Sequence, residues 1–168
     1  ALIQAFIDIE NQLPGWRLIL IGGTETGSNH LLKSLRSKSQ GHRISIFTNI
    51  TDKKLQQLYA QSKLYWHAAG FGADLRANPQ KAEHFGISIA QAMGHGAVPL
   101  VFNAGGPTEI VTATSGRIWT HLKDLKSETI KLANNDPLRQ KIAGSGQKRA
   151  KFFSKANFCK KVHELAEV

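Results

Sequence analysis

Two glycine turns in the middle of the chain combine residue types that could bind an anion. Glu83-His84-Phe85-Gly86-Ile87-Ser88 leads through a glycine into a helical segment, Ser88–His95. Ala104-Gly105-Gly106-Pro107 follows an apolar segment, Val98–Phe102, and opens a second helix. Backbone N–H groups and the helix dipole favour negative charge at the start of a helix. Two such starts predict a site for a ligand with a diphosphate; the alternative is that the glycines only make tight turns.

Short apolar segments alternate with helical segments, and these elements must position the two turns. Runs this apolar are typical of strands buried on both faces of a parallel sheet. The alternation indicates an α/β fold, in which ligands bind at the carboxyl ends of the strands. The predicted strands are Arg17–Ile21, Arg43–Phe47, Leu64–His67, Val98–Phe102 and Arg117–Trp119. The predicted helices are 1–13, Asn29–Lys38, Asp52–Gln61, Ser88–His95, Asp124–Asn134, Pro137–Phe152 and Ala156–Val168.

The first predicted helix has apolar residues at helical spacing but no capping residue in front of them. We interpret the chain as a fragment of a larger protein that starts inside a helix. In a doubly wound sheet of order 3-2-1-4-5-6 the first strand is central, and no segment of this sequence supplies it. We therefore expect Arg17–Ile21 and Leu64–His67 to pair directly, to receive a strand from a neighbouring chain, or to pair with residues upstream of Ala1.

Length and composition indicate one soluble globular domain. The chain has 168 residues, of which 41% are hydrophobic and 20% are charged, and this excludes a disordered or collagen-like protein. No apolar run approaches the roughly 18 residues of a membrane span, and no secretory signal is present. The single cysteine, Cys159, excludes an internal disulfide and suits a reducing compartment, so we expect a cytoplasmic protein. The seven histidines show no ligand spacing, so no metal site is predicted.

The net charge of +10 and a pI near 10.0 favour an anionic partner. Between Arg139 and Lys161 there are eight Lys or Arg residues and no acid. We interpret this run as a solvated face of the C-terminal helices; the alternative is a patch for peripheral contact with the inner membrane face or an acidic partner. Binding of single-stranded nucleic acid is disfavoured, because no aromatic residues alternate with the basic ones.

The stretch EHFGISIAQAMGHGAVPLVFNAGGPTEIV resembles the donor-binding signature of family 4 retaining glycosyltransferases (glycosyl transferases group 1), which use nucleotide sugars. PGWRLILIGG, ISIFTNITDKKLQQLYAQSKLYWHAA and NNDPLRQKIAGSGQKRAKFFS resemble further parts of the same domain. The resemblance covers nearly all of the chain at the length of the C-terminal, donor-binding domain alone. It implies a Rossmann-like doubly wound parallel sheet, the C-terminal half of a GT-B fold.

The resemblance also implies roles for residues of the first turn. Glu83 corresponds to the family's first motif glutamate, expected to meet hydroxyls of the donor sugar as the catalytic-site carboxylate. The resemblance also implies that Phe85, Gly86 and Ile87 present their backbone N–H groups to the sugar and the diphosphate. Gln91 stands where the family has a second glutamate that grips the ribose. A glutamine can still accept and donate but lacks the carboxylate charge, so donor binding or donor preference is expected to change; the alternative is an exposed helix residue.

Other residues are assigned to the nucleotide sugar on weaker grounds. Gly105 and Gly106 belong to the second turn, and Gly22 and Gly23 lie at the same predicted sheet edge. The base is expected near Asn49 and Ile50, although a turn role for this asparagine is an equal alternative.

Three further side chains lie near the predicted site. Arg76 and Lys81 occupy a long polar segment before Glu83 and are expected to reach the ligand. For His67, at the end of a predicted strand, we favour a satisfied structural histidine over one that faces the pocket.

The implied activity is retaining transfer of a hexosyl-type sugar from a nucleoside diphosphate, with no metal or other cofactor, in carbohydrate biosynthesis. The acceptor, a glycan or a lipid-linked sugar, would be held by a missing N-terminal domain. The donor-phosphate Arg and Lys of the family lie upstream of Ala1, so the chain alone is expected to be inactive. The alternatives are a non-catalytic anion-binding module, for nucleic acid or a membrane surface, and a sugar-nucleotide epimerase of the same architecture.

Overall fold

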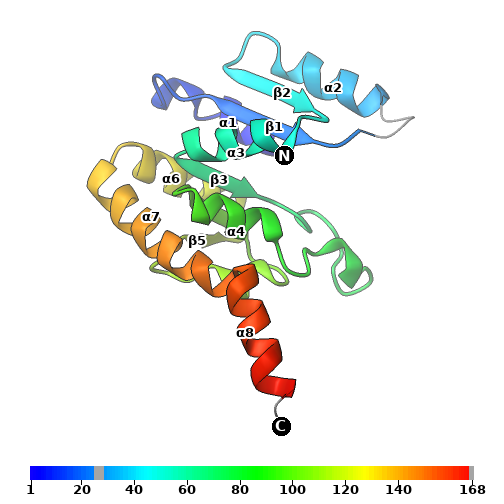
Figure 1. Ribbon diagram of the computed structural model, residues 1–168. Helices are drawn as coiled ribbons and strands as arrows, with labels where there is room; N and C mark the ends of the chain where they lie inside the picture. Colours follow the sequence, from blue (N-terminus) through cyan, green and yellow to red (C-terminus); the bar gives the residue numbers. More distant parts are fainter. Residues whose placement is uncertain (25–28, 167–168) are drawn as a thin grey trace.

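The computed structural model describes residues 1–24 and 29–166 and has an α/β architecture (Figure 1). The strands are β1 (Leu18–Gly22), β2 (Ile44–Thr48), β3 (Leu64–His67), β4 (Val98–Phe102) and β5 (Arg117–Trp119). The α-helices are α1 (Leu2–Ile7), α2 (Asn29–Ser39), α3 (Asp52–Gln61), α4 (Ile87–Gly94), α5 (Pro107–Ile110), α6 (Leu122–Ala133), α7 (Asp136–Ala150) and α8 (Lys155–Ala166). The short 3-10 turns are η1 (Glu10–Gln12), η2 (Pro79–Lys81) and η3 (Lys151–Phe153).

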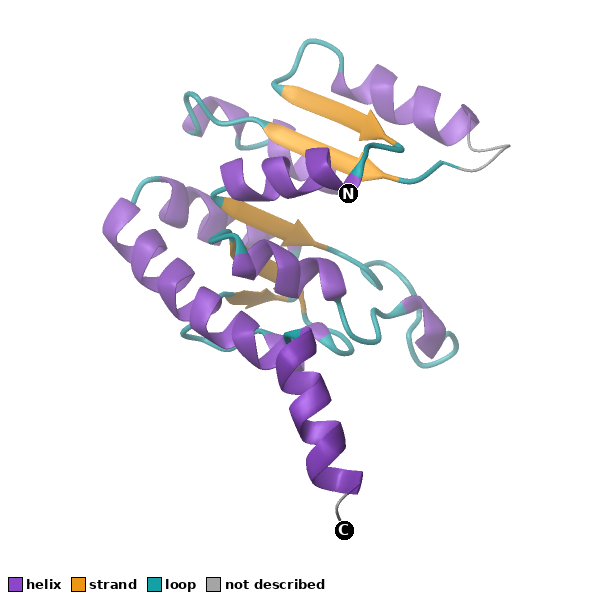
Figure 2. Cartoon of the chain, in the orientation of Figure 1, coloured by secondary structure: helices purple, strands orange, loops and turns teal. Residues whose placement is uncertain are grey.

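The strands are parallel throughout, as Figure 2 shows by their arrowheads, and they form two sheets rather than one. β1 pairs with β2, and β4 lies between β3 and β5. Within the described residues β1 and β3 are not hydrogen-bonded to each other. The expectation that these two strands pair directly is therefore wrong. The strand orders β1-β2 and β3-β4-β5 nevertheless agree with a doubly wound fold. In such a fold successive strands are added outward on both sides of a central position.

β4 is the centre of the core, because alternate residues of this strand face two different helical layers. Val98 and Leu100 pack with Trp119, Leu125 and neighbouring residues of α6 and α7. On the other face Val101 packs with Ile89 and Met93 of α4, with Ile110 of α5 and with Val111, which follows α5. The prediction of a strand buried on both faces is thus confirmed for β4. Most residues of β1, β2 and β3 are only half-buried.

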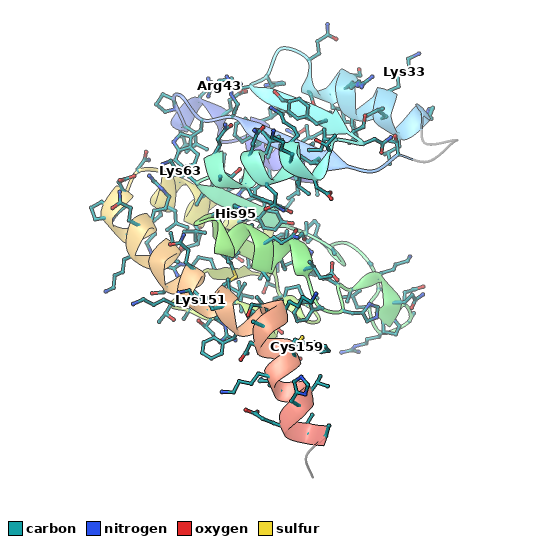
Figure 3. The ribbon with its side chains drawn as sticks, in the orientation of Figure 1. Lys33, Arg43, Lys63, His95, Lys151 and Cys159 are labelled. Carbon is teal, nitrogen blue, oxygen red and sulfur yellow. The ribbon has the colours of Figure 1, made fainter. Side chains whose placement is uncertain are left out.

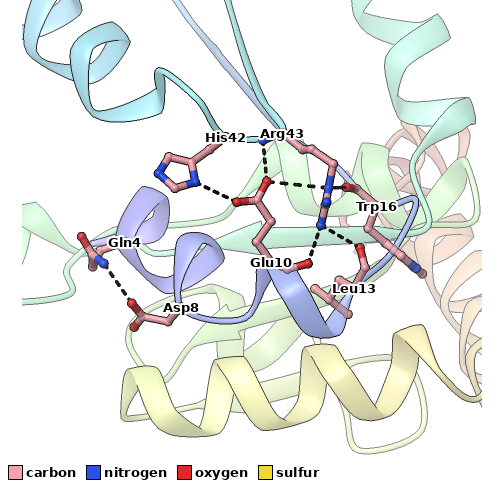
Figure 4. A network of polar contacts seen from close by, with 7 residues as sticks. All are labelled: Gln4, Asp8, Glu10, Leu13, Trp16, His42 and Arg43. Atoms are coloured by element: carbon pink, nitrogen blue, oxygen red, sulfur yellow. Dashed lines mark hydrogen bonds and ion pairs between the residues drawn. The ribbon is translucent and has the colours of Figure 1, made fainter.

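The predicted helix 1–13 is wrong in one respect: it consists of α1 followed by the separate turn η1. Phe6, Ile9 and Leu13 all face inward and form one apolar cluster. Between them the buried Glu10 turns toward the start of β2, where Arg43 N donates to its Oε1 at 2.5 Å and His42 Nδ1 lies 2.7 Å from its Oε2 (Figure 4). These tertiary contacts favour the tighter turn over a continuous helix.

The remaining helices begin close to where the sequence predicts. Thr51 caps α3 by accepting from Lys54 N, and Asn135 caps α7, which has Pro137 in its first turn. α7 ends two residues earlier than predicted, and η3 links it to α8. α8 extends away from the rest of the molecule (Figure 1), and residues 167–168 of the predicted last helix lie outside the described residues. Among the helices that the structure describes, none has the length and hydropathy of a membrane span.

Candidate functional site

Two loops meet at the carboxyl edge of β3 and β4, and the second glycine turn is the reason they can meet. Gly106 N donates to the carbonyl oxygen of Glu83 at 2.9 Å. A Cβ atom at Gly105 would clash with that same carbonyl oxygen, and one at Gly106 would clash with the carbonyl oxygen of His84. Gly105 also has a φ of 63°, which disfavours other residues. These glycines therefore position the first loop, and their contact with a ligand stays a prediction.

Gly86 starts α4 in a left-handed conformation, with a φ of 96°. A Cβ atom here would lie 2.7 Å from Ile89 Cδ1, so the turn requires glycine on two grounds. In the described part of the chain no hydrogen bond uses the N–H groups of Gly86, Ile87 or Ser88. The flanking side chains of Phe85 and Ile87 are 45% and 66% exposed. The start of α4 thus has unpaired donors between two exposed side chains, which is an arrangement that can bind anions.

Glu83 lies directly before this helix start and is held at several points. Phe85 N donates weakly to its Oε1 at 3.4 Å, and its carbonyl is bound by Gly106. Its Oε2 lies 3.7 Å from His67 Nε2, while 34% of its side chain remains exposed. The Glu83 carboxylate therefore faces Phe85 N and His67 within the protein and is also partly exposed to solvent.

His67 is buried, but the prediction of a satisfied structural histidine is wrong. Its Nδ1 is among the buried side-chain atoms that have no hydrogen-bond partner in the described residues. Burial lowers the pKa of His67, and the nearby Glu83 carboxylate opposes this shift only in part. The histidine is therefore held in its neutral form beside the carboxylate.

Gln91 lies on α4, one turn after Ile87, and its side chain is exposed. Together with Phe85 and Ile87 it lines a groove of about 1260 Å³ between α4 and the α7–α8 region. Lys148 and Lys151 also line this groove. The predicted diphosphate and ribose residues are thus brought together beside basic side chains.

The candidates at the ends of β1 and β2 form a separate part of the same edge. Asn49 has a φ of 51°, accepts from Thr24 N at 2.9 Å and donates through Nδ2 to Thr24 Oγ1 at 2.9 Å. Its N–H donates to Gly22 O. The turn role of Asn49 is thus present in the structure. Contact of Gly22, Gly23 and Ile50 with a nucleotide stays a prediction.

Several other side chains take no clear part in this site. His95 lies at the far end of α4 from Gly86 (Figure 3), and its Nδ1 is 2.8 Å from Gln91 O. Arg76 and Lys81 are exposed in the loop after β3, and their contact with a ligand stays a prediction. Among the described residues no three His, Cys, Asp or Glu side chains form a group that could hold a metal ion.

The basic run of the C-terminal helices divides into two kinds of residue. Arg139 is buried, pairs with Asp136 and donates to Leu132 O at 2.8 Å, and Arg149 donates to the carbonyl groups of Glu109 and Ile110. For these two arginines the prediction of a solvated face is wrong, because they tie helices to the core. It is confirmed for the six exposed lysines, which are Lys141, Lys148, Lys151, Lys155, Lys160 and Lys161.

Tyr65 and Ser88 also hold the site, although the sequence analysis assigned no role to either side chain. Tyr65 donates its hydroxyl to Ser88 Oγ at 2.9 Å and so links β3 to the first turn of α4. Burial raises the pKa of Tyr65, which keeps it a donor. The only signal in the sequence is the two-residue spacing between Tyr65 and His67, which places both on one face of a strand.

Parallel strands in this order, with the candidate residues gathered at one carboxyl edge, define a Rossmann-like α/β domain of the GT-B type. The family model of glycosyl transferases group 1 matches residues 1–156, and the chain belongs to that family. No curated protein sequence matches the chain.

Solved structures agree on the fold. Anabaena Alr3699/HepE in complex with UDP is 22% identical, with a TM-score of 0.78 over 98% of this chain and 45% of that chain. Sucrose-phosphate synthase from Thermosynechococcus elongatus is 16% identical, with a TM-score of 0.75 over 98% and 41%. The C-terminal domain of LpcC, a group 1 glycosyl transferase from Francisella tularensis, is 18% identical, with a TM-score of 0.70 over 89% and 75%. The chain thus spans less than half the length of the first two proteins.

Proposed function

We propose that this domain binds a nucleoside-diphosphate sugar and serves the retaining transfer of a hexosyl-type sugar. The observation that carries the proposal is the open start of α4, where the N–H groups of Gly86, Ile87 and Ser88 have no partner among the described residues. Glu83 lies beside these donors with an exposed carboxylate. Support also comes from HepE, a protein of similar fold in complex with UDP and with UDP-glucose.

In this proposal the start of α4 acts on the leaving group. Charge accumulates on the diphosphate as the bond to the sugar breaks, and preorganised N–H groups stabilise that charge. Glu83 accepts hydrogen bonds from sugar hydroxyls and so fixes the orientation of the ring. Gln91 binds the ribose from the next turn of the helix. The chemistry requires no metal ion, because the backbone donors and basic groups meet the diphosphate.

We propose further that a second domain completes the active site. HepE and sucrose-phosphate synthase are each more than twice as long as the part that this chain matches. That domain would hold the acceptor, a glycan or a lipid-linked sugar, and residues outside this chain would supply the Arg and Lys that bind the diphosphate. Residues 1–168 alone are then expected to bind nucleotide sugars weakly and to transfer nothing.

A nucleotide panel tests the binding proposal. Thermal unfolding of the intact protein is measured with UDP, GDP and ADP, each against its nucleoside monophosphate. One diphosphate is expected to stabilise the protein by about 2.7 kcal/mol at a hundredfold excess over Kd, and the matching monophosphate by clearly less. Equal effects of the diphosphate and the monophosphate for all three bases would contradict a diphosphate site.

A second proposal concerns α8 and an anionic membrane surface. Phe158, Val162 and Leu165 share one helical face and are all exposed. Lys155 and Lys161 flank that face by their spacing, which is typical of helices that lie in a membrane interface. We expect the intact protein to sediment with phosphatidylserine vesicles and not with phosphatidylcholine vesicles. Phe158→Glu should abolish sedimentation; unchanged sedimentation of this variant, or none of the wild type, would contradict the proposal.

A further inference from the structure

His67 is placed by the most rigid part of the fold rather than by a loop. It is the last residue of β3 and lies opposite Val101 of the buried strand β4. Only 9% of the residue is exposed, and Nε2 is its atom nearest to Glu83. A buried histidine with an unpaired Nδ1 costs stability, so a role beyond packing has to be considered.

The neighbours of His67 in β3 fix its orientation. Trp66 points to the opposite face of the strand, where its Nε1 donates to Thr129 Oγ1 at 3.0 Å. Tyr65 points to the same face as His67 and donates to Ser88 Oγ. These two hydrogen bonds anchor both faces of β3 and so fix the face on which the imidazole lies.

Tyr65 and His67 therefore hold the two ends of one short segment. Tyr65 binds Ser88 in the first turn of α4, and His67 faces the carboxylate of Glu83, five residues earlier. The glycine turn with the unpaired N–H groups lies between these two contacts. A shift of β3 would thus move Glu83 and the start of α4 together.

We propose that His67 is a positioning residue that orients the Glu83 carboxylate toward the donor sugar. In this proposal Nε2 of the neutral imidazole carries the proton and faces Oε2, and Oε1, which accepts only weakly from Phe85 N at 3.4 Å, also accepts from a sugar hydroxyl. The separation of 3.7 Å exceeds a hydrogen bond, so the proposed role requires the contact to shorten when the sugar binds. This inference rests on the proposed function of Glu83.

The burial of His67 supports this role. Desolvation disfavours the imidazolium, and the lowered pKa keeps the ring neutral at physiological pH. A neutral donor orients the carboxylate without cancelling the charge that binds the sugar. The charged or titratable groups facing His67 from the elements around it are Glu83 and, along β3, Tyr65.

The test measures how much the sugar adds to binding. Calorimetry on the intact protein compares UDP-glucose with UDP, GDP-mannose with GDP, and ADP-glucose with ADP. For the pair that binds, the affinity ratio of nucleotide sugar to nucleotide is expected to fall about tenfold in Glu83→Ala and in His67→Leu. The double variant is expected to show no further loss, because His67 acts only through Glu83.

Two controls separate positioning from folding. His67→Gln keeps a side-chain N–H donor and should recover most of the ratio, whereas His67→Leu should not. Affinity for the nucleotide without sugar should stay within about twofold in every variant. His95→Ala, at the far end of the same helix, should change neither quantity.

The outcomes distinguish this inference from the proposal on which it rests. If Glu83→Ala lowers the ratio and His67→Leu does not, the inference about His67 is overturned and the proposed function stands. Additive losses in the double variant, or equal losses of plain nucleotide binding in the Leu and Gln variants, also overturn it. If no pair binds, or if Glu83→Ala leaves the ratio unchanged, the proposed role of Glu83 fails and His67 has nothing to position.

Discussion

Glu83 is the residue on which the proposed chemistry depends most. Its carboxylate is one-third exposed and lies beside the open start of α4. We expect Glu83→Ala to abolish transfer in the intact protein while its circular dichroism and melting temperature are preserved, and Glu164→Ala on α8 serves as the matched control. Activity within about threefold of wild type, a barrier change of only ~0.6 kcal/mol, would contradict a role in catalysis.

A substitution of Gln91 is expected to increase the affinity for nucleotide rather than to reduce it. A carboxylate accepts hydrogen bonds roughly twice as strongly as a neutral amide, so Gln91→Glu is expected to tighten nucleotide binding measured by calorimetry. Gln57→Glu, exposed on α3, adds the same charge elsewhere and should not. Weaker binding by Gln91→Glu would refute the assignment of this residue to the ribose.

A substitution of Gly106 tests the close packing of the two loops rather than ligand binding. A methyl group at this position meets the carbonyl oxygen of His84, and the backbone of that loop has to move. Overpacking of this kind costs about 1–3 kcal/mol, so Gly106→Ala should lower the free energy of unfolding in urea by that amount. Gly144→Ala in α7 meets no atom within 4 Å and should be neutral or slightly stabilising. Equal stability of the two variants would show that the loops do not depend on their close approach.

The sequence predicted where the glycine turns lie, but not that Gly105 and Gly106 position the Glu83 loop. The close approach to Glu83 and His84 is a contact between residues about 20 positions apart, and no local pattern encodes such a contact. The same holds for the hydrogen bonds of Asn49 with Thr24 across two strand ends. A local sequence pattern predicts that a turn forms, whereas the contacts of that turn depend on residues that are distant in the sequence.

At the scale of elements, Glu10 connects the N-terminal segment to β2 (Figure 4). The backbone N–H of Arg43, followed by the side chain of His42, holds the pKa of Glu10 below its ordinary value of 4.5. The Arg43 guanidinium also donates to carbonyl groups of Glu10, Leu13 and Trp16. A single buried carboxylate thus organises the turn that replaces the predicted helix 1–13.

The lowered pKa gives the contribution of Glu10 a defined pH dependence. A carboxyl group whose pKa is lower in the folded state stabilises the protein above its unfolded pKa and loses that effect as the pH falls through the folded value. Glu10→Gln should therefore cost about 1–3 kcal/mol at pH 7 in urea unfolding, and the cost should shrink below pH 4.5. Glu164→Gln, whose pair with Lys160 is exposed, should show little effect at either pH. A cost for Glu10→Gln that is the same at pH 7 and pH 3 would contradict the network.

The strands were predictable because each apolar run is short and bounded by glycine, proline or polar residues. The burial of Val98–Val101 on both faces follows directly from that pattern. The separation of β1 from β3 into two sheets was not predictable, since periodicity reports the faces of an element and not which strand edges meet. The break after α1 was missed for the same reason, because it depends on Arg43 and His42 more than 30 residues away.

For the molecule as a whole, the parallel strands bring every candidate loop to one edge. Each candidate segment follows the carboxyl end of a strand. Gly23 follows β1, Asn49 follows β2, the Glu83 loop follows β3, and the second glycine turn follows β4. The basic C-terminal helices lie beside this edge through Lys148 and Lys151, which share the groove with Gln91. The excess positive charge is therefore placed near the proposed diphosphate as well as on α8.

The central claim is that a diphosphate binds at the start of α4, and amide hydrogen exchange tests it most directly. The intact protein is exchanged with and without UDP, GDP and ADP in turn. We predict that the diphosphate that binds will protect the amides of Phe85, Gly86 and Ile87, because in the described residues Gly86 N and Ile87 N have no hydrogen-bond partner and Phe85 N has only a weak one. Unchanged exchange at these three amides, together with clear protection elsewhere in the protein, would contradict the account.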